Sequence, residues 1–182
     1  VWAGPLAVSV TLCGRSAGIP PILRSGAKAG DAVCVTGALG GAWRGSRHLT
    51  FTPRIREART LASRCHVRAM IDVSDGLAAD LHHICRASGV GAELRAEAVP
   101  VHADAALAAP QRTALQAALA DGEDYELLFA LPAAEAEALA AKPPFAVPVS
   151  LVGAIVEGTG VALVHADGRR EALEAMGWEH QT

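Results

Sequence analysis

The sequence is poor in aromatic residues and contains no closely paired cysteines. Only 4% of its 182 residues are aromatic, so aliphatic side chains and alanine must fill the core. None of the four cysteines, Cys13, Cys34, Cys65 and Cys85, belongs to a Cys-x-x-Cys pair. We therefore predict reduced thiols in the apolar elements of a cytoplasmic protein, and no zinc site.

Other missing features exclude several classes of partner. The longest nearly apolar run, residues 145–156, contains a proline and a serine and is too short to span a bilayer. The net charge is −3 and the arginines are scattered, which leaves no basic footprint for nucleic acid. The glycines of residues 37–41 are not followed by the lysine and hydroxyl of a Walker phosphate loop. We expect neither a membrane nor a nucleic-acid partner.

Hydrophobic periodicity predicts a mixture of strands and helices. We expect strands over 6–12, 32–36, 69–73, 90–98, 125–131 and 147–156, helices over 77–87, 110–120 and 132–141, and a final hairpin around 167–168. Thr52-Pro53 has the residue types that begin a helix, whereas the polar residues 44–50 suggest a flexible linker. This order predicts an α+β fold, a mixed β-sheet with helices packed on one face.

Acidic residues follow one apolar strand at the point where a helix is expected to begin. Residues 69–77 read Ala-Met-Ile-Asp-Val-Ser-Asp-Gly-Leu, so Asp72, Ser74 and Asp75 lie between the strand and the helix. Serine and aspartate are typical helix caps, and a carboxylate there is favoured by the helix dipole. The same residues could instead hold Mg²⁺ beside a phosphate. The segment alone leaves both interpretations open.

A second acidic cluster precedes another buried run. Glu123, Asp124 and Glu126 come directly before the apolar residues 127–131. Carboxylates are costly to bury without partners, so these acids must face solvent or hold cations and hydrogen-bond donors.

Together the two segments resemble the thiamine-monophosphate kinase family. That family carries Ile-Asp-x-Ser-Asp-Gly-Leu and Gly-Glu-Asp-Tyr-Glu-Leu segments about as far apart as Asp75 and Glu123, which are 48 positions apart here. Residues 4–11, 24–31 and 177–180 also match the family, so the resemblance covers essentially the whole chain. Two departures are a short linker between Gly41 and Thr52, and Gln181 where an aromatic residue is expected.

The resemblance implies a set of site residues that includes no covalent or acid–base catalyst. Its members are the Mg²⁺ ligands Asp72 and Asp75, the ATP contacts Arg24 and Ser74, and the substrate contacts Glu123 and Trp178. Neighbouring carboxylates repel unless a cation lies between them, and a guanidinium pairs well with phosphate. A tryptophan face attracts a cationic thiazolium ring, although Trp178 could also simply seal the last segment onto the core.

Other polar residues near these segments have simpler interpretations. Asp124 and Glu126 are expected to support the mouth of the strand. His82 and His83 are adjacent on a helix and point about 100° apart, so they cannot easily share one ion. We predict that these histidines are solvated or hydrogen-bonded.

The resemblance further implies transfer of the γ-phosphoryl group of ATP to thiamine monophosphate by a cytoplasmic homodimer. Residues 1–14 would then be the last strand of a truncated N-terminal ATP-binding domain through which dimers form, and residues 15–182 a C-terminal α/β domain that is inactive alone. One alternative is another ATP-dependent synthetase of the aminoimidazole ribonucleotide synthetase-like superfamily, acting on a phosphorylated metabolite. The other is a non-catalytic fragment that only packs or dimerises.

Overall fold

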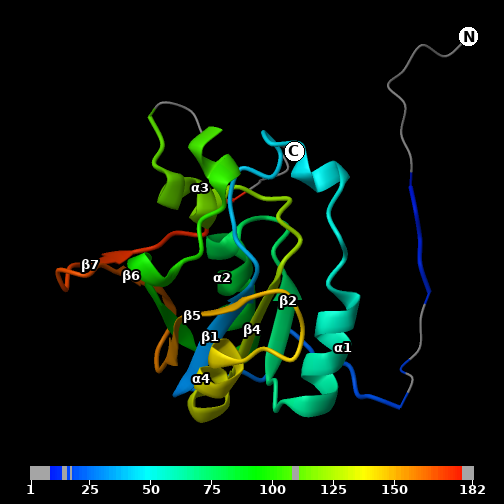
Figure 1. The fold of residues 1–182 in the computed structure, drawn as a ribbon. Coiled ribbons are helices and arrows are strands. Elements are labelled where there is room, and N and C mark those ends of the chain that lie inside the picture. Colours follow the sequence, from blue (N-terminus) through cyan, green and yellow to red (C-terminus); the bar gives the residue numbers. More distant parts are fainter. Residues whose placement is uncertain (1–8, 14–15, 17, 108–110, 178–182) are drawn as a thin grey trace, which may run out of the picture.

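The computed structural model describes residues 9–13, 16, 18–107 and 111–177 (Figure 1). Its strands are β1 (Asp31–Thr36), β2 (Ala69–Asp72), β3 (Gly91–Arg95), β4 (Leu127–Pro132), β5 (Val149–Val156), β6 (Gly160–Val164) and β7 (Arg170–Ala172). The helices are α1 (Ile55–Arg64), α2 (Leu77–Ser88), α3 (Ala114–Ala120) and α4 (Ala133–Ala141). Among the described residues, no helix combines the length and the apolar character needed to cross a membrane.

The strands form one mixed sheet in the order β2-β4-β1-β5-β3-β6-β7. Neighbouring strands are antiparallel except β3 and β6, which pair in parallel. The predicted final hairpin is present as β6 and β7. The α+β class and the mixed sheet are therefore confirmed.

Helices cover both faces of the sheet, not one as expected. Every residue of β1 is buried. Val33 and Val35 pack with α2 in one cluster, whereas Cys34 packs with Leu61 of α1 and Leu139 of α4 in another. The expectation of one covered face was wrong because β1 and β4 are apolar on both sides, so each face needs its own cover.

Several element boundaries also differ from the expectation. Residues 9–13 form no strand and extend away from the body of the domain (Figure 1). Thr52 does not cap α1, which begins after Arg54. Helix α3 begins later than the expected residue 110, after a capping box. In this box the Thr113 hydroxyl accepts from the Gln116 N–H, and the Gln116 side chain accepts from the Thr113 N–H.

The four cysteines are free thiols, as predicted, but they are not all in the core. Burial raises the pKa of Cys34 to about 12 and that of Cys85 to about 11. Such thiols are inert at neutral pH. Cys65 is partly buried, whereas Cys13 is exposed and lies in no helix or strand.

Candidate functional site

The two acidic segments meet at the same end of the sheet because β2 and β4 are antiparallel partners. Three backbone hydrogen bonds continue the pairing beyond the strands: Val73 N–H to the Glu126 carbonyl (2.8 Å), Tyr125 N–H to the Val73 carbonyl (2.8 Å) and Glu123 N–H to the Ser74 carbonyl (2.9 Å). The turn after β2 and the turn before β4 therefore form one unit, which neither segment could show by itself.

Two glycines let the chain pass close to this unit. A Cβ atom at Gly122 would lie 2.4 Å from the Ser74 carbonyl oxygen, and one at Gly177 would lie 2.4 Å from the Asp75 carbonyl oxygen. Any larger residue would have to displace the turn that carries Ser74 and Asp75.

A buried carboxylate orients that turn. Asp80 Oδ2 accepts hydrogen bonds from the N–H groups of Ser74 (3.1 Å), Asp75 (3.1 Å) and Gly76 (3.2 Å). Burial raises the pKa of Asp80 to about 7, and the charges of Asp75 and Asp72 add to the increase. The N-cap of α2 is Gly76, and it has no side-chain cap. The interpretation of Ser74 and Asp75 as caps is therefore wrong, and their side chains remain available for a ligand.

The unit forms one wall of a cleft with a volume of about 470 Å³. Ser74, Asp75 and Glu123 line this cleft, and Gly177 lines it as well. Asp72 is exposed at the end of β2. Burial and a hydrogen bond to Glu123 raise the pKa of Tyr125, and the charges of Glu123, Asp72 and Asp75 raise it further. The charges of Asp72, Asp75 and Glu123 thus all act on Tyr125, but Asp72 is not among the residues that line the cleft.

The segment before β4 has an unusual backbone. Glu123 has a φ of 68° and Tyr125 a φ of 51°, both in the left-handed region that non-glycine residues rarely adopt. Such conformations cost on the order of 1–3 kcal/mol each and occur often at functional sites. Here Glu123 lines the cleft, while the intervening Asp124 and the following Glu126 are buried.

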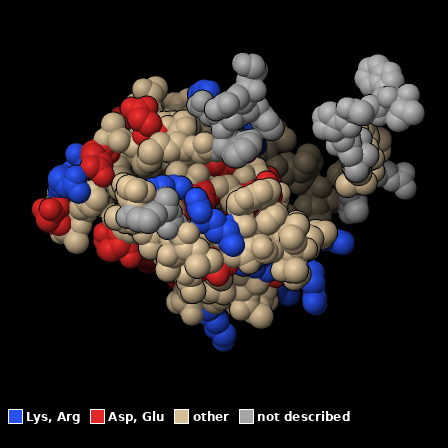
Figure 2. Space-filling view, turned by 90° about the horizontal axis from the view of Figure 1, so that it is seen from above, with Lys and Arg blue, Asp and Glu red and all other residues tan. Residues whose placement is uncertain are grey.

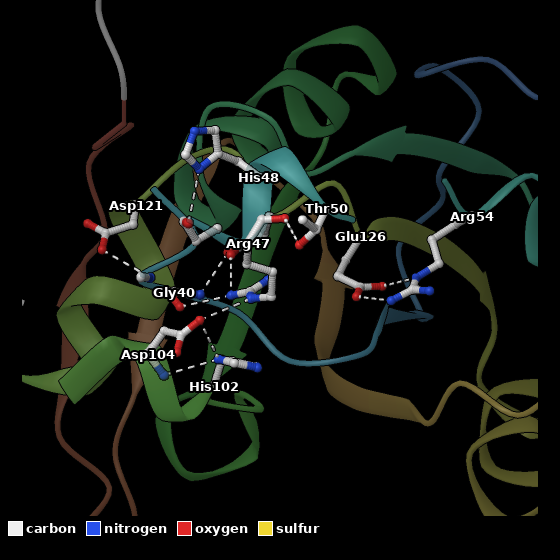
Figure 3. Close-up of polar contacts among 12 residues, drawn as sticks. Gly40, Arg47, His48, Thr50, Arg54, His102, Asp104, Asp121 and Glu126 are labelled. Carbon is white, nitrogen blue, oxygen red and sulfur yellow. Dashed lines mark hydrogen bonds and ion pairs between the residues drawn. The ribbon is translucent and has the colours of Figure 1, made fainter. Parts of the chain in front are cut away.

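The two buried acids support the mouth of the strand, as predicted. The Glu126 carboxylate accepts two hydrogen bonds from Arg54, at 2.7 and 2.6 Å (Figure 3), and one from the Thr36 hydroxyl at 2.6 Å. Asp124 accepts from the Gly40 N–H at 2.7 Å and from Arg47 at 3.1 Å.

Residues 44–50 are not the flexible linker that their polarity suggested. Arg47 forms ion pairs with Asp104 (3.4 Å) and Asp124 (3.1 Å) and donates to the Gly40 carbonyl at 3.0 Å. The anchored segment contains a short 3₁₀ helix, Arg47–Leu49.

Asp124 is expected to make stability depend on pH. Burial raises its pKa to about 6, although the Gly40 N–H and Arg47 act in the opposite direction. The folded state then holds this proton more tightly than the unfolded state, so the free energy of unfolding falls as pH rises from about 4 to 6. We expect Asp124→Asn to remove this fall. A pKa difference of about two units between the folded and unfolded states corresponds to a change of up to about 3 kcal/mol in the free energy of unfolding.

The measurement is urea unfolding of both proteins between pH 4 and 7. The difference between them isolates Asp124, because Asp80 and all other groups titrate in both. Asp167→Asn, an exposed turn residue, is the matched control. An unchanged slope in Asp124→Asn would assign the pH dependence to another group.

Other residues named from the sequence lie outside the cleft or outside the described residues. Arg24 is exposed, and its carbonyl accepts from Ser88 at the far end of α2 (3.4 Å). Burial is the largest effect on the pKa of His83 and lowers it. The charge of Arg24 lowers this pKa further, whereas the charge of Asp75 raises it. Trp178 is not among the described residues, although Gly177 before it lines the cleft.

The histidines of α2 differ in their surroundings. His82 Nε2 lies 2.7 Å from the Leu173 carbonyl oxygen, which agrees with the predicted hydrogen-bonded role. His83 offers a ligand atom within 4.8 Å of those of Asp75 and Asp80. Since Mg²⁺ prefers oxygen ligands, this mixed group does not replace Asp72 and Asp75 as the candidate magnesium ligands.

Sequence reasoning missed four residues that line the cleft: Trp43, Arg44, Arg112 and Asp121. Asp121 pairs with Arg112 at 2.6 Å and accepts from the Gly41 N–H at 3.2 Å. Only Asp121 had a visible signal, since it belongs to the same acidic run as Glu123. On the face shown in Figure 2, basic and acidic side chains are interspersed.

The mixed sheet, with an acidic strand mouth beside a helix N-terminus, is the fold of a known protein family. The chain belongs to the family of AIR synthase related proteins, whose C-terminal domain matches residues 28–166. It is also similar to individual thiamine-monophosphate kinases. Identity is 42% over 181 residues with the Rhodopirellula baltica enzyme, and 34% over 201 residues with that of Salmonella typhimurium. The alignments include 98% and 97% of this chain but only 56% and 60% of those relatives.

Solved structures give the same picture. Thiamine-monophosphate kinase from Stenotrophomonas maltophilia has a TM-score of 0.65 at 30% identity, covering 81% of this chain and 53% of its own. AaThiL complexed with AMPPCP and TMP has a TM-score of 0.68 at 29% identity, covering 88% and 54%. HypE of E. coli, a hydrogenase maturation protein, also reaches 0.68 at 25% identity, covering 87% and 53%. The fold thus occurs in proteins of different function, and the site residues must decide between them.

Proposed function

We propose that the protein transfers the γ-phosphoryl group of ATP to thiamine monophosphate, giving thiamine diphosphate and ADP. The observation that carries this proposal is the joining of the two family-like segments, around Asp75 and Glu123, at a single cleft. The similarity to thiamine-monophosphate kinases over 98% of the chain supports it. So does the relative AaThiL, whose structure is described as a complex with AMPPCP and TMP.

The residues at the strand mouth fit Mg²⁺. Asp72 and Asp75 offer carboxylate oxygens, the ligands that this hard cation prefers. Their charges raise the pKa of the neighbouring Asp80 beyond the effect of burial, which shows that negative charge is crowded here. Bound Mg²⁺ would neutralise phosphate charge. Its remaining coordination positions would be filled by water and by the substrate phosphates.

The remaining residues would bind and orient the two substrates. Ser74 and Arg24 are assigned to ATP, whereas Glu123 and Trp178 are assigned to thiamine monophosphate, Glu123 by accepting from its aminopyrimidine. A terminal phosphate oxygen of thiamine monophosphate attacks the γ-phosphorus in line, and the bond from that phosphorus to the ADP oxygen breaks. No side chain forms a covalent bond in this scheme.

The organisation of the whole protein is part of the same proposal. Residues 9–13 form no strand in this structure, and we propose that residues 1–14 become the last strand of a preceding ATP-binding domain in the whole protein. Residues 15–182 are assigned to the C-terminal domain. A homodimer formed through the preceding domain and a cytoplasmic location follow the same family pattern. The support is the length of the relatives, of which the chain spans 56% and 60%.

The test is a product assay on the intact protein with ATP, Mg²⁺ and thiamine monophosphate. We expect thiamine diphosphate and ADP in equal amounts, with little free phosphate. Release of inorganic phosphate without thiamine diphosphate would favour the alternative of a synthetase acting on another phosphorylated metabolite. Absence of any ATP-dependent reaction would favour a non-catalytic role.

A further inference from the structure

The cleft has an aromatic wall that the proposed function does not yet use. Trp43 is 67% exposed and lines the cleft together with Asp75 and Glu123. Tryptophan is highly buried on average in folded proteins. An indole that is exposed to solvent beside a cleft is therefore a candidate contact for a ligand.

The indole packs against an anchored turn. Its ring stacks on that of His48, with centroids 4.5 Å apart and an interplanar angle of 23°. His48 Nδ1 lies 3.2 Å from the Ala42 carbonyl oxygen, and the ion pairs of Arg47 anchor the same turn (Figure 3). A side chain fixed before binding loses less conformational entropy when a ligand arrives.

The charges around Trp43 favour a cationic ring. Asp121 is neutralised by Arg112. Asp75 is assigned to Mg²⁺. Among the described residues, Glu123 forms no ion pair. An aromatic face with a free carboxylate nearby attracts a positively charged ligand both through the ring and through the charge. Arg44, on the same turn, supplies a cation suited to the phosphate of such a ligand.

We propose that the indole of Trp43 stacks on the ring system of a cationic, phosphorylated heteroaromatic acceptor and selects it over neutral analogues. The inference rests on the proposed function and deepens it, because thiamine monophosphate carries a cationic thiazolium ring. Trp43 acts as a specificity-determining residue and takes no part in the transfer itself.

Variants of Trp43 test the inference in the intact protein. Trp43→Leu keeps apolar bulk and removes the aromatic face, so the KM for thiamine monophosphate should rise roughly 2- to 30-fold. Trp43→Phe should have a smaller effect. The KM for ATP and the Tm should not change, because Trp43 is largely exposed. The matched control is Leu49→Ala, an exposed apolar residue of the neighbouring 3₁₀ turn that does not line the cleft.

Two further readouts separate stacking from packing. Thiochrome monophosphate, a derivative whose ring system carries no charge, should inhibit the unaltered protein weakly, and the preference for the cationic ring should shrink in Trp43→Leu. Thiamine monophosphate should quench a component of tryptophan fluorescence that is missing from Trp43→Phe. This comparison distinguishes Trp43 from the other tryptophans of the intact protein.

The outcomes are distinct from those of the proposed function. Failure of the unaltered protein to form thiamine diphosphate would overturn the function itself. Normal turnover with an unchanged KM for thiamine monophosphate in Trp43→Leu would overturn only the role of Trp43. A lower Tm with unchanged KM, or equal weakening toward ATP, would likewise show that Trp43 serves packing.

Discussion

Asp75→Asn is expected to lower kcat by roughly 10²- to 10³-fold, which corresponds to about 3–4 kcal/mol of lost transition-state stabilisation. The amide keeps the volume of the carboxylate but loses the anionic oxygen that would bind Mg²⁺. The Tm should change little, because the Asp75 side chain does not cap α2. The measurement is kcat across a range of Mg²⁺ concentrations, together with a thermal unfolding curve.

Asp72→Asn should behave in the same way, since both carboxylates are assigned to the metal. Asp167→Asn is the control, because this exposed residue lies in the β6–β7 turn, where its carboxylate accepts from the Arg169 N–H. Near-normal kcat of both site variants at limiting Mg²⁺ would reduce these acids to a structural role in the turn.

Glu126→Ala is expected to destabilise the fold by about 3–5 kcal/mol, the usual cost of breaking a buried ion pair. Glu126 is only 4% exposed and accepts from both Arg54 and the Thr36 hydroxyl. Its removal leaves the Arg54 guanidinium, whose side chain is 21% exposed, without this partner beside the start of β4. Urea unfolding, with the free energy extrapolated to water, measures the loss.

Two further variants show whether the loss comes from the pairing. Replacing Arg54 and Glu126 together by leucine should recover much of the stability, because no unpaired charge remains. Glu171→Ala breaks exposed ion pairs to Arg169 and His165 and should have no measurable effect. A small loss in Glu126→Ala would mean that water replaces the carboxylate at little cost.

The sequence predicted those parts of the fold that depend on local periodicity. The stripe of Leu77, Leu81 and Ile84 gave helix α2, and the alternation around Leu94 gave the half-buried strand β3. It did not predict which faces are covered, because a strand that is apolar at every position does not indicate where its helices lie. The start of α1 was misplaced because Arg54 is held by Glu126, which is 72 positions away.

The site divides in a similar way. Asp72, Asp75 and Glu123 stood out because acids next to buried strands require partners. Trp43 comes from a segment with no regular spacing, and Arg112 lies just before the N-cap of α3, so only the tertiary fold brings them to the cleft. The anchoring of residues 44–50 likewise depends on Asp104 and Asp124, which local polarity cannot reveal.

The left-handed backbone at Glu123 and Tyr125 predicts which substitutions laboratory evolution of the protein would select. Glycine or asparagine would adopt these conformations at lower cost, so a screen for heat resistance alone should enrich them at both positions. A screen for growth that depends on the product should restore glutamate at 123. A position that favours glycine or asparagine in the first screen and its present residue in the second is one where selection has kept binding at the expense of stability.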